Sequence, residues 1–142
     1  MYKHILIATD GSELAGKAVA TGLALAKRLG AKVTAVTAIE PWISIASSDT
    51  AAAFMEYHRA AEQDAARILG KVSTTAQTHG VQCETITVTE AAAEAIIETA
   101  KSKQCDLIVM SSHGRRGLAR VLLGSQATRV LTLSSEPVLI CR

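Results

Sequence analysis

The sequence predicts an α/β protein: a five-stranded parallel, doubly wound sheet of the Rossmann-like kind with helices on both faces. Short runs rich in β-branched residues alternate with longer stretches in which apolar and small residues recur every three or four positions. Such a helical stretch separates each pair of consecutive strands, and parallel strands need crossovers of this kind. The 142 residues suit a single domain over 1–142, and the hydrophobic content of 49% excludes a disordered chain.

The chain opens with a predicted strand followed by a helix. Residues 5–8, Ile-Leu-Ile-Ala, form a short apolar run that is typical of a strand covered on both faces. The turn Thr9-Asp10-Gly11-Ser12 follows it. Ser12 is a suitable N-cap for the next helix, because its hydroxyl can accept a hydrogen bond from a first-turn amide. Gly30 stands where the C-terminal cap of that helix belongs.

The middle of the chain predicts two more strands and two more helices. Residues 32–39 are rich in valine and threonine and form the second strand, which Pro41 ends because proline cannot donate to a sheet. Apolar and small residues at helical spacing predict a long helix from about 51 to 79. Partial alternation over 81–89 predicts the third strand, and 91–103 the helix after it.

The last third of the chain predicts a buried strand, a glycine-containing loop, a helix and a final strand. Residues 106–110 are almost entirely apolar, as in a strand covered on both faces. The loop spans 111–117. The last helix begins at Gly124-Ser125, and the short run 137–141 forms the fifth strand.

Composition excludes several classes of function. The net charge is +2 and only 3% of the residues are aromatic, so neither a basic face nor a stacking platform for nucleic acid is expected. The 3 cysteines lie far apart without a CxxC motif, which argues against a disulfide framework or a zinc site and favours a reducing compartment. No apolar stretch reaches ~18 residues, so no membrane span is predicted. We therefore expect a cytoplasmic protein without a metal site of its own.

The predicted topology brings three segments to one edge of the sheet. In open parallel sheets, ligands bind beyond the carboxyl ends of the strands, where the strand order reverses. If the first and fourth strands are neighbours, residues 8–12 and 110–117 meet there, and 124–126 returns to the same edge. Gly114 and Gly117 allow the backbone to approach a ligand closely. A helix beginning at this edge presents unpaired amides that favour a phosphate.

Charged residues in the same segments admit two interpretations. Arg115, Arg116 and Arg120 supply positive charge for an anion, and Asp10 can accept a hydrogen bond from a ribose hydroxyl or an adenine amino group. In the alternative interpretation, the glycines only close turns, Ser125 only caps a helix and the arginines are solvated. The residues alone leave both open, because the spacing GxxG is a weak signature and neither GxxxxGK[ST] nor GxGxxG is present.

Three segments resemble the signature of the universal stress protein family. They are the run Met-Ser-Ser-His-Gly-Arg-Arg-Gly-Leu-Ala-Arg-Val-Leu-Leu-Gly-Ser at 110–125, the opening Ile-Leu-Ile-Ala-Thr-Asp-Gly-Ser at 5–12, and the ending Pro-Val-Leu-Ile at 137–140. The resemblance covers essentially the whole chain, in order and in spacing. It implies the same doubly wound fold.

One branch of that family binds ATP through the motif G-x2-G-x9-G-[ST], and the other branch lacks the motif and binds no nucleotide. Gly114 and Gly124-Ser125 match the motif here, whereas Ser111 replaces its first glycine. A second departure lies outside the motif: this chain has Glu90 before the third crossover helix, in a region where many relatives have glycine and proline. The resemblance implies binding of ATP, accompanied by Mg²⁺, or of AMP or ADP. The implied nucleotide-binding residues are Ala8, Thr9, Asp10 and Ala38 on the adenine and ribose side, and Ser111, Ser112, His113, Gly114, Arg115, Arg116, Gly117, Gly124, Ser125 and Gln126 on the phosphate side.

No catalytic residue is assigned. Ser111, Ser112 and His113 invite comparison with a nucleophile and its base, but adjacent residues rarely reach each other as a catalytic pair, and no GxSxG elbow is present. No general base is evident near the expected γ-phosphate. We therefore expect no enzyme, or at most slow hydrolysis of ATP.

The last predicted strand suggests how the protein associates with a partner. The run Pro137 to Cys141 is short and apolar, and a strand at the edge of a sheet needs cover. Members of the family commonly pair these strands across a twofold axis, so the resemblance implies a homodimer. The expected role is a stress-response or regulatory module with an unidentified protein partner. The alternative is a dimeric interaction protein of the same fold that binds no nucleotide.

Overall fold

The computed structural model describes residues 1–43, 50–115 and 122–142. It confirms the predicted fold, because five parallel strands form a sheet in the order β3-β2-β1-β4-β5 with helices on both faces. The strands are β1 (His4–Ala8), β2 (Lys32–Ile39), β3 (Cys83–Thr89), β4 (Leu107–Ser111) and β5 (Val138–Cys141). The helices are α1 (Glu13–Leu29), α2 (Ala51–Thr78), α3 (Ala92–Ser102) and α4 (Ser125–Leu133).

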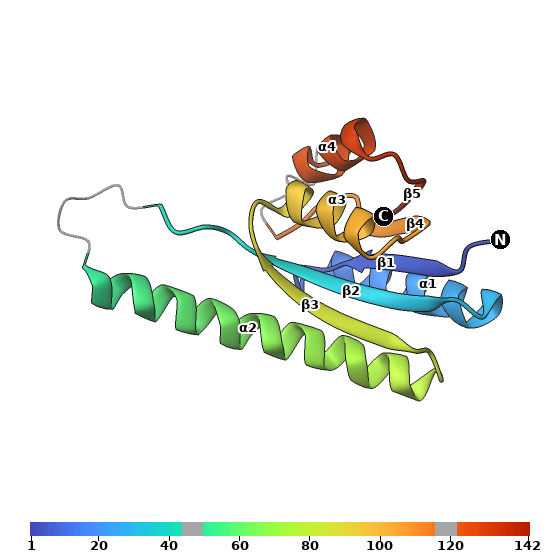
Figure 1. The fold of residues 1–142 in the computed structure, drawn as a ribbon, viewed down its shortest axis with the longest axis horizontal. Coiled ribbons are helices and arrows are strands. Elements are labelled where there is room, and N and C mark those ends of the chain that lie inside the picture. Colours follow the sequence, from blue (N-terminus) through green and yellow to red (C-terminus); the bar gives the residue numbers. More distant parts are fainter. Residues whose placement is uncertain (44–49, 116–121) are drawn as a thin grey trace.

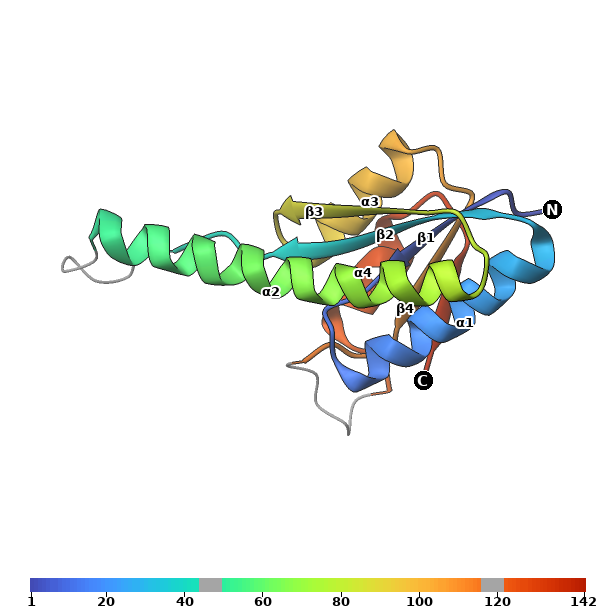
Figure 2. The ribbon, with the colours of Figure 1, turned by 90° about the horizontal axis from the view of Figure 1, so that it is seen from below.

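Alternate residues of each strand face the two helical layers. In β1, Ile5 and Ile7 pack with α1 and α2, whereas Leu6 and Ala8 pack with α3 and α4. Figures 1 and 2 show these two pairs of helices on opposite faces of the sheet. Every residue of β1 is buried, as expected for the central strand of a sheet covered on both sides.

Local signals predicted from the sequence place α1. The Ser12 hydroxyl accepts a hydrogen bond from the Ala15 amide at 3.2 Å, and Gly30 ends the helix with a left-handed φ of 66°. Gly22 lets α1 lie close to the sheet, because a Cβ there would stand 2.6 Å from the Cδ1 atom of Ile7. The helix is thereby fixed against the strand that leads into the candidate site.

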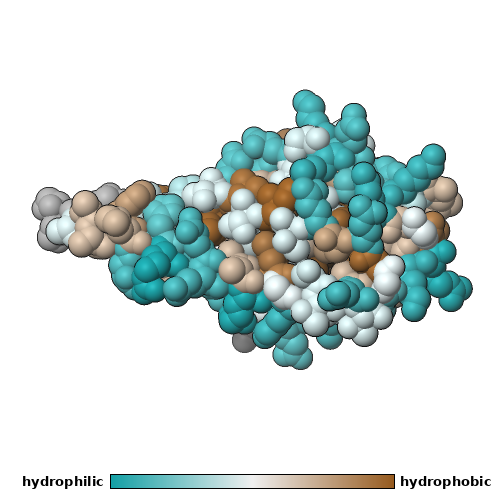
Figure 3. All heavy atoms as spheres, turned by 60° about the horizontal axis from the view of Figure 1, so that its bottom comes forward, coloured by the Kyte–Doolittle hydropathy of each residue, from teal (hydrophilic) through white to brown (hydrophobic). Residues whose placement is uncertain are grey.

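The long helix α2 extends well past the sheet. Its buried residues lie in its second half, from Ala65 to Ala76, and its first half projects beyond the strand ends (Figure 1). Side chains of Trp42, Phe54 and Tyr57 cluster there, and the Tyr57 hydroxyl donates to the Glu40 carbonyl. The space-filling view shows apolar surface on this projecting end (Figure 3).

The strand order reverses beside β1. The chain passes from β1 through α1 to β2 and through α2 to β3, and α3 then carries it back to β4 on the other side of β1. The register between β1 and β2 ends at Ala8 and Val36, whereas 37–39 continue to pair with β3. The last three residues of β2 therefore have an uncovered edge on the β1 side.

No helix within the described ranges combines the length and the apolar character needed to cross a membrane.

Candidate functional site

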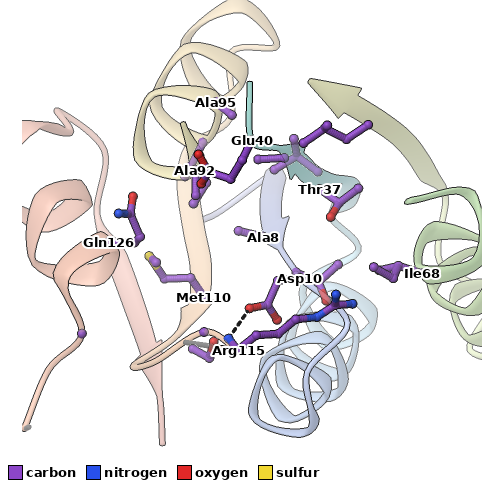
Figure 4. Close-up of a pocket in the computed structure, with 18 of the residues that line it drawn as sticks. Ala8, Asp10, Thr37, Glu40, Ile68, Ala92, Ala95, Met110, Arg115 and Gln126 are labelled. Atoms are coloured by element: carbon purple, nitrogen blue, oxygen red, sulfur yellow. Dashed lines mark hydrogen bonds between the residues drawn. The ribbon is translucent and has the colours of Figure 1, made fainter. Parts of the chain in front are cut away.

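The carboxyl ends of the strands border a cavity of about 570 Å³, a volume usual for small-molecule sites. The ends of β1, β2 and β4 form its base, α2 forms one wall, and the first turns of α3 and α4 form the opposite wall (Figure 4). The cavity lies where the strand order reverses, as expected for an open parallel sheet.

Every predicted site residue that the structure describes lines this cavity. Those residues are Ala8, Thr9, Asp10, Ala38, Ser111, Ser112, His113, Gly114, Arg115, Gly124, Ser125 and Gln126. Arg116 and Gly117, together with Arg120, lie outside the described residues. Segments more than a hundred positions apart in the sequence are thus brought to one place, and the predicted roles of the individual residues remain predictions.

The uncovered edge of β2 presents main-chain groups to the cavity. The Thr9 amide donates to the Val36 carbonyl at 3.0 Å, so the polar groups of Val36 point toward β1. Main-chain polar groups alternate in direction along a strand, and those of Ala38 therefore point the same way. Since β1 has already ended, the amide and carbonyl of Ala38 have no main-chain partner among the described residues.

The first turn of α4 presents a second set of main-chain groups. Gly124 is the N-cap and has no side chain to bind the first amides, and the first helical hydrogen bond runs from the Thr128 amide to the Gly124 carbonyl at 3.0 Å. The amides of 125–127 therefore precede the helical ladder, and the helix dipole favours an anion beside them.

Other predicted amides are already occupied within the protein. The Gly124 amide donates to the Ser112 carbonyl at 2.7 Å, the Ser112 amide donates to the Cys141 carbonyl at 2.8 Å, and the Arg115 amide donates to Asp10 Oδ2 at 2.8 Å. These three amides secure the loop itself, and that these segments hold phosphate remains a prediction.

Asp10 connects the two loops instead of standing free. Its Oδ1 accepts from the Ser12 amide at 2.9 Å, while its Oδ2 accepts from Arg115 (Figure 4). A Cβ at Gly114 would stand 2.7 Å from Asp10 Oδ2, so this glycine makes room for a carboxylate of the same chain. Each carboxylate oxygen retains a second lone pair toward a ligand.

The adjacent Ser112 and His113 side chains do reach each other, contrary to the expectation from the sequence. Ser112 Oγ lies 3.0 Å from His113 Nδ1, and the Ser111 hydroxyl donates to the His113 carbonyl at 2.8 Å. The described residues nevertheless form no catalytic triad, because Ser112 is only 2% exposed and the buried His113 Nε2 has no hydrogen-bond partner among them. These contacts shape the loop.

The side chain of Arg115 points toward α2, away from the first turn of α4 (Figure 4). Its Nη2 atom donates to Asp64 Oδ2 at 3.2 Å, and Asp64 Oδ1 also accepts from Arg67 at 2.6 Å. The bond from Arg67, with a smaller contribution from Arg115, holds the pKa of the Asp64 carboxyl below its ordinary value, so Asp64 is charged at neutral pH. The Arg115 guanidinium is thus bound to a carboxylate in this arrangement, and its role as a positive charge for an anion remains a prediction.

Gln126 joins the two helices of the opposite wall. Its Oε1 atom accepts from the Ala93 amide at 3.0 Å, in the first turn of α3. Ala91 is the N-cap of α3 and provides no side-chain hydrogen bond, so Gln126 supplies the missing acceptor.

The contribution of α2 to the site was not predicted from the sequence. Tyr57, Ala61, Asp64, Ala65 and Ile68 line the cavity at helical spacing. Their periodicity was visible, but an apolar stripe on a helix normally faces the core, and nothing local distinguishes its cavity end. Within the described ranges, no group of three or more His, Cys, Asp or Glu side chains is arranged to hold a metal ion.

The chain is similar to known proteins over its full length. The family model described as the universal stress protein family matches residues 1–142. A universal stress protein of Methanocaldococcus jannaschii is 34% identical over 144 residues, covering 100% of this chain and 83% of the relative. Universal stress protein YxiE of Bacillus subtilis is 32% identical over 148 residues and is covered in full, as is this chain.

Solved structures are similar over nearly the whole chain. UspA from Lactobacillus plantarum has a TM-score of 0.86 at 23% identity, covering 99% of this chain and 98% of that one. A universal stress protein in complex with cAMP has a TM-score of 0.76 at 28% identity, covering 99% and 97%. The protein from Archaeoglobus fulgidus in complex with dAMP has a TM-score of 0.71 at 17% identity, a likeness of fold alone, covering 99% and 98%.

Proposed function

This chain belongs to the universal stress protein family, and from that premise we propose that it binds an adenine nucleotide, with ATP as the expected ligand, in the cavity beyond β1 and β4. One observation carries the proposal: two sets of main-chain groups without partners among the described residues face one cavity from opposite sides. Ala38 offers them on β2, and 125–127 offer them at the start of α4.

The β2 side suits the edge of an adenine ring. The Ala38 amide is a donor and its carbonyl is an acceptor, which complements the N1 acceptor and the 6-amino donor of adenine. Apolar side chains of Ala8, Ile96 and Met110 line the cavity nearby and provide surface for the faces of the ring. Ribose hydroxyls can donate to the second lone pairs of Asp10.

The α4 side suits a phosphate. Its first-turn amides and the Ser125 hydroxyl are donors, and the helix dipole favours negative charge at this end. Ser112, Gly114 and Gly124 act indirectly in this proposal, because their contacts hold the loop from which the donors are presented. Mg²⁺ would accompany ATP, with phosphate oxygens and water as most of its ligands.

Two related proteins add support, since one solved relative is in complex with cAMP and another with dAMP. Both ligands contain adenine and a single phosphate. These two ligands support binding of an adenine base and of one phosphate. The expectation of ATP rests on the resemblance to the family's glycine motif.

Isothermal titration calorimetry with ATP, AMP and GTP tests the proposal. We expect both adenine nucleotides to bind more tightly than GTP. Gly124→Ala should weaken ATP binding about tenfold, or ~1.4 kcal/mol, because its Cβ would stand 2.7 Å from the Ser112 carbonyl and displace the start of α4. Gly16→Ala is the control, since a Cβ there meets nothing within 4 Å. A wild-type chain that binds neither ATP nor AMP, or an unchanged affinity in Gly124→Ala, would refute the proposed site.

We further propose a homodimer formed through β5, Pro137 to Cys141, acting in the cytoplasm as a stress-response module with a regulatory protein partner. β5 is at the end of the strand order, so its outer edge has no neighbouring strand among the described residues. Leu139 is exposed on β5, and Leu131 and Leu133 are exposed on α4. Such apolar surface favours burial against a second protein surface.

A specific observation favours the alternative, a dimeric interaction protein of the same fold without a nucleotide. The amides of Ser112, Arg115 and Gly124 and both oxygens of Asp10 already have partners within the chain. The loop is therefore held together by its own contacts. Native mass spectrometry of freshly purified protein separates the two proposals, because only the first predicts a retained adenine nucleotide.

A further inference from the structure

The side chain of Arg115 joins three separate segments at the α2 wall of the cavity. Its main-chain amide is bound to Asp10 after β1, and its guanidinium reaches Asp64 on α2 at 3.2 Å. On the way it passes Gly11, since a Cβ at Gly11 would stand 3.0 Å from Arg115 Nη2. We call this arrangement of Asp10, Arg115 and Asp64 the arginine strap.

The turn beneath the strap provides the space that the guanidinium needs. Gly11 has a φ of +79°, and a Cβ there would also stand 2.7 Å from Ile68 Cγ1 on α2. Because Gly11 has no side chain, the space between this turn and α2 stays open for the guanidinium.

The position of the Arg115 guanidinium affects how much negative charge a ligand in the cavity can carry. Among the described lining residues, Asp10, Glu40 and Asp64 carry carboxylates and Arg115 carries the one guanidinium, although Arg67 from outside the lining also binds Asp64. One phosphate can be bound by the first-turn amides of α4, which need no cation. Each further phosphate adds negative charge near these carboxylates, and Arg115 can compensate that charge only if it leaves Asp64.

We propose that Asp64 is a specificity-determining residue that limits how well the site accepts long phosphate chains. It does so by holding the Arg115 guanidinium on the α2 wall and by adding its own negative charge there. The inference rests on the proposed nucleotide function and extends it to the class of ligand: Asp64 shifts the preference from nucleoside triphosphates toward monophosphates.

The test compares the affinities for ATP and AMP in Asp64→Asn, measured by calorimetry in one buffer with Mg²⁺ and repeated with a chelator. The substitution preserves side-chain size and removes one negative charge, so it releases Arg115 toward the ligand. We expect the ratio of the AMP to the ATP dissociation constant to rise about three- to tenfold. This rise should shrink at 0.5 M KCl, because added salt screens the interaction between the charges. The Debye length falls from about 10 Å at 0.1 M salt to ~3 Å at 1 M.

Glu62→Gln is the matched control. It removes the same charge from the same helix at an exposed position that does not line the cavity. We expect the ratio to stay within about twofold of the wild-type value, because exposed charges at a distance are screened. Arg115→Gln should move the ratio in the opposite direction to Asp64→Asn. It keeps the inference testable even if Asp64→Asn folds poorly.

The outcomes separate this inference from the proposed function. A wild-type chain that binds neither nucleotide overturns the proposed function and this inference with it. A wild-type chain that binds both, combined with equal ratios in Asp64→Asn and Glu62→Gln, overturns only the role of Asp64. Parallel losses of ATP and AMP affinity in Arg115→Gln would also overturn it, because they would mean that Arg115 only maintains the loop.

Discussion

Asp10 and Arg115 lie 105 positions apart in the sequence, and a hydrogen bond of 2.8 Å from the Arg115 amide to Asp10 Oδ2 joins the turn after β1 to the loop after β4. The other carboxylate oxygen accepts from the Ser12 amide at 2.9 Å. One side chain therefore fixes both the entry into α1 and the loop at the cavity. Its geometry requires two acceptor atoms, which an amide side chain cannot supply.

Asp10→Asn should therefore lower both stability and nucleotide affinity. The substitution places an NH2 group against a main-chain amide, so one hydrogen bond is replaced by two facing donors. We expect the free energy of unfolding to fall by about 1–3 kcal/mol, as measured by urea denaturation, and the affinity for AMP to fall in calorimetry.

Asp106→Asn is the matched control for this prediction. Asp106 likewise accepts from two amides, those of Lys3 at 2.8 Å and His4 at 3.1 Å, but at the opposite end of the sheet. It should lower stability and leave the AMP affinity unchanged. If both variants lost affinity in proportion to stability, Asp10 would have no particular role at the cavity.

Two glycines of α1 should respond in opposite ways to alanine. Gly16→Ala faces open space and should raise the free energy of unfolding by about 0.5–1 kcal/mol, because alanine favours the helix. Gly22→Ala gains the same helix propensity but brings a Cβ within 2.6 Å of Ile7 Cδ1 in the core. Overpacking should therefore lower the free energy of unfolding by about 1–3 kcal/mol. Chemical denaturation of both variants checks the pair, and equal effects would contradict the close contact between α1 and β1.

The fold was largely predictable because local signals agree with the tertiary structure. The capping residues Ser12 and Gly30 and the apolar run of β1 each specify their element without help from distant residues. One boundary shifted where hydrogen bonds at the end of a helix extend into the predicted strand. The third strand begins at Cys83, two residues later than predicted, because the Val81 amide still bonds back to the Ala76 carbonyl at the end of α2.

The composition of the candidate site was also predictable, whereas the partners within it were not. The topological rule collects residues from different segments at one edge, but it does not say which amide is free. The direction of Arg115 depends on Asp64, which lies 51 positions earlier on α2, and on the space above Gly11. Such contacts leave no periodic signal in the sequence.

Stability should fall on mild acidification because of His4. This side chain is buried, with Nε2 2.8 Å from the Thr34 hydroxyl oxygen, and its burial, together with the charge of Lys32, lowers its pKa below the ordinary value of 6.5. The unfolded chain therefore binds the proton more readily than the folded one. The contribution of His4 is fully present above pH 6.5 and is lost progressively as the pH falls from there toward the lower pKa of the folded state.

Thermal unfolding at pH 7.5 and at pH 5.5 measures this effect. In His4→Gln the decrease in melting temperature between the two pH values should be smaller than in the wild type. His58→Gln, on the projecting part of α2, should retain the wild-type decrease. An equal decrease in His4→Gln and the wild type would show that other groups cause the acid sensitivity.

The proposed dimer makes a prediction about one apolar side chain on β5. Leu139 is 36% exposed on the outer strand of the sheet. A lysine there would place a charge at the centre of the proposed interface, where an unpaired buried charge is strongly unfavourable. Leu139→Lys should therefore be monomeric in light scattering after size exclusion, whereas the wild type should show twice the 14.9 kDa of one chain.

Leu29→Lys provides the matched control. Leu29 is 38% exposed, close to the exposure of Leu139, but it ends α1 at the opposite end of the strands from the cavity. If apolar exposure alone drove association, both variants would weaken it equally. If the β5 edge is the interface, only Leu139→Lys dissociates the dimer, because only there does the charge lie on a strand whose outer edge has no neighbouring strand among the described residues.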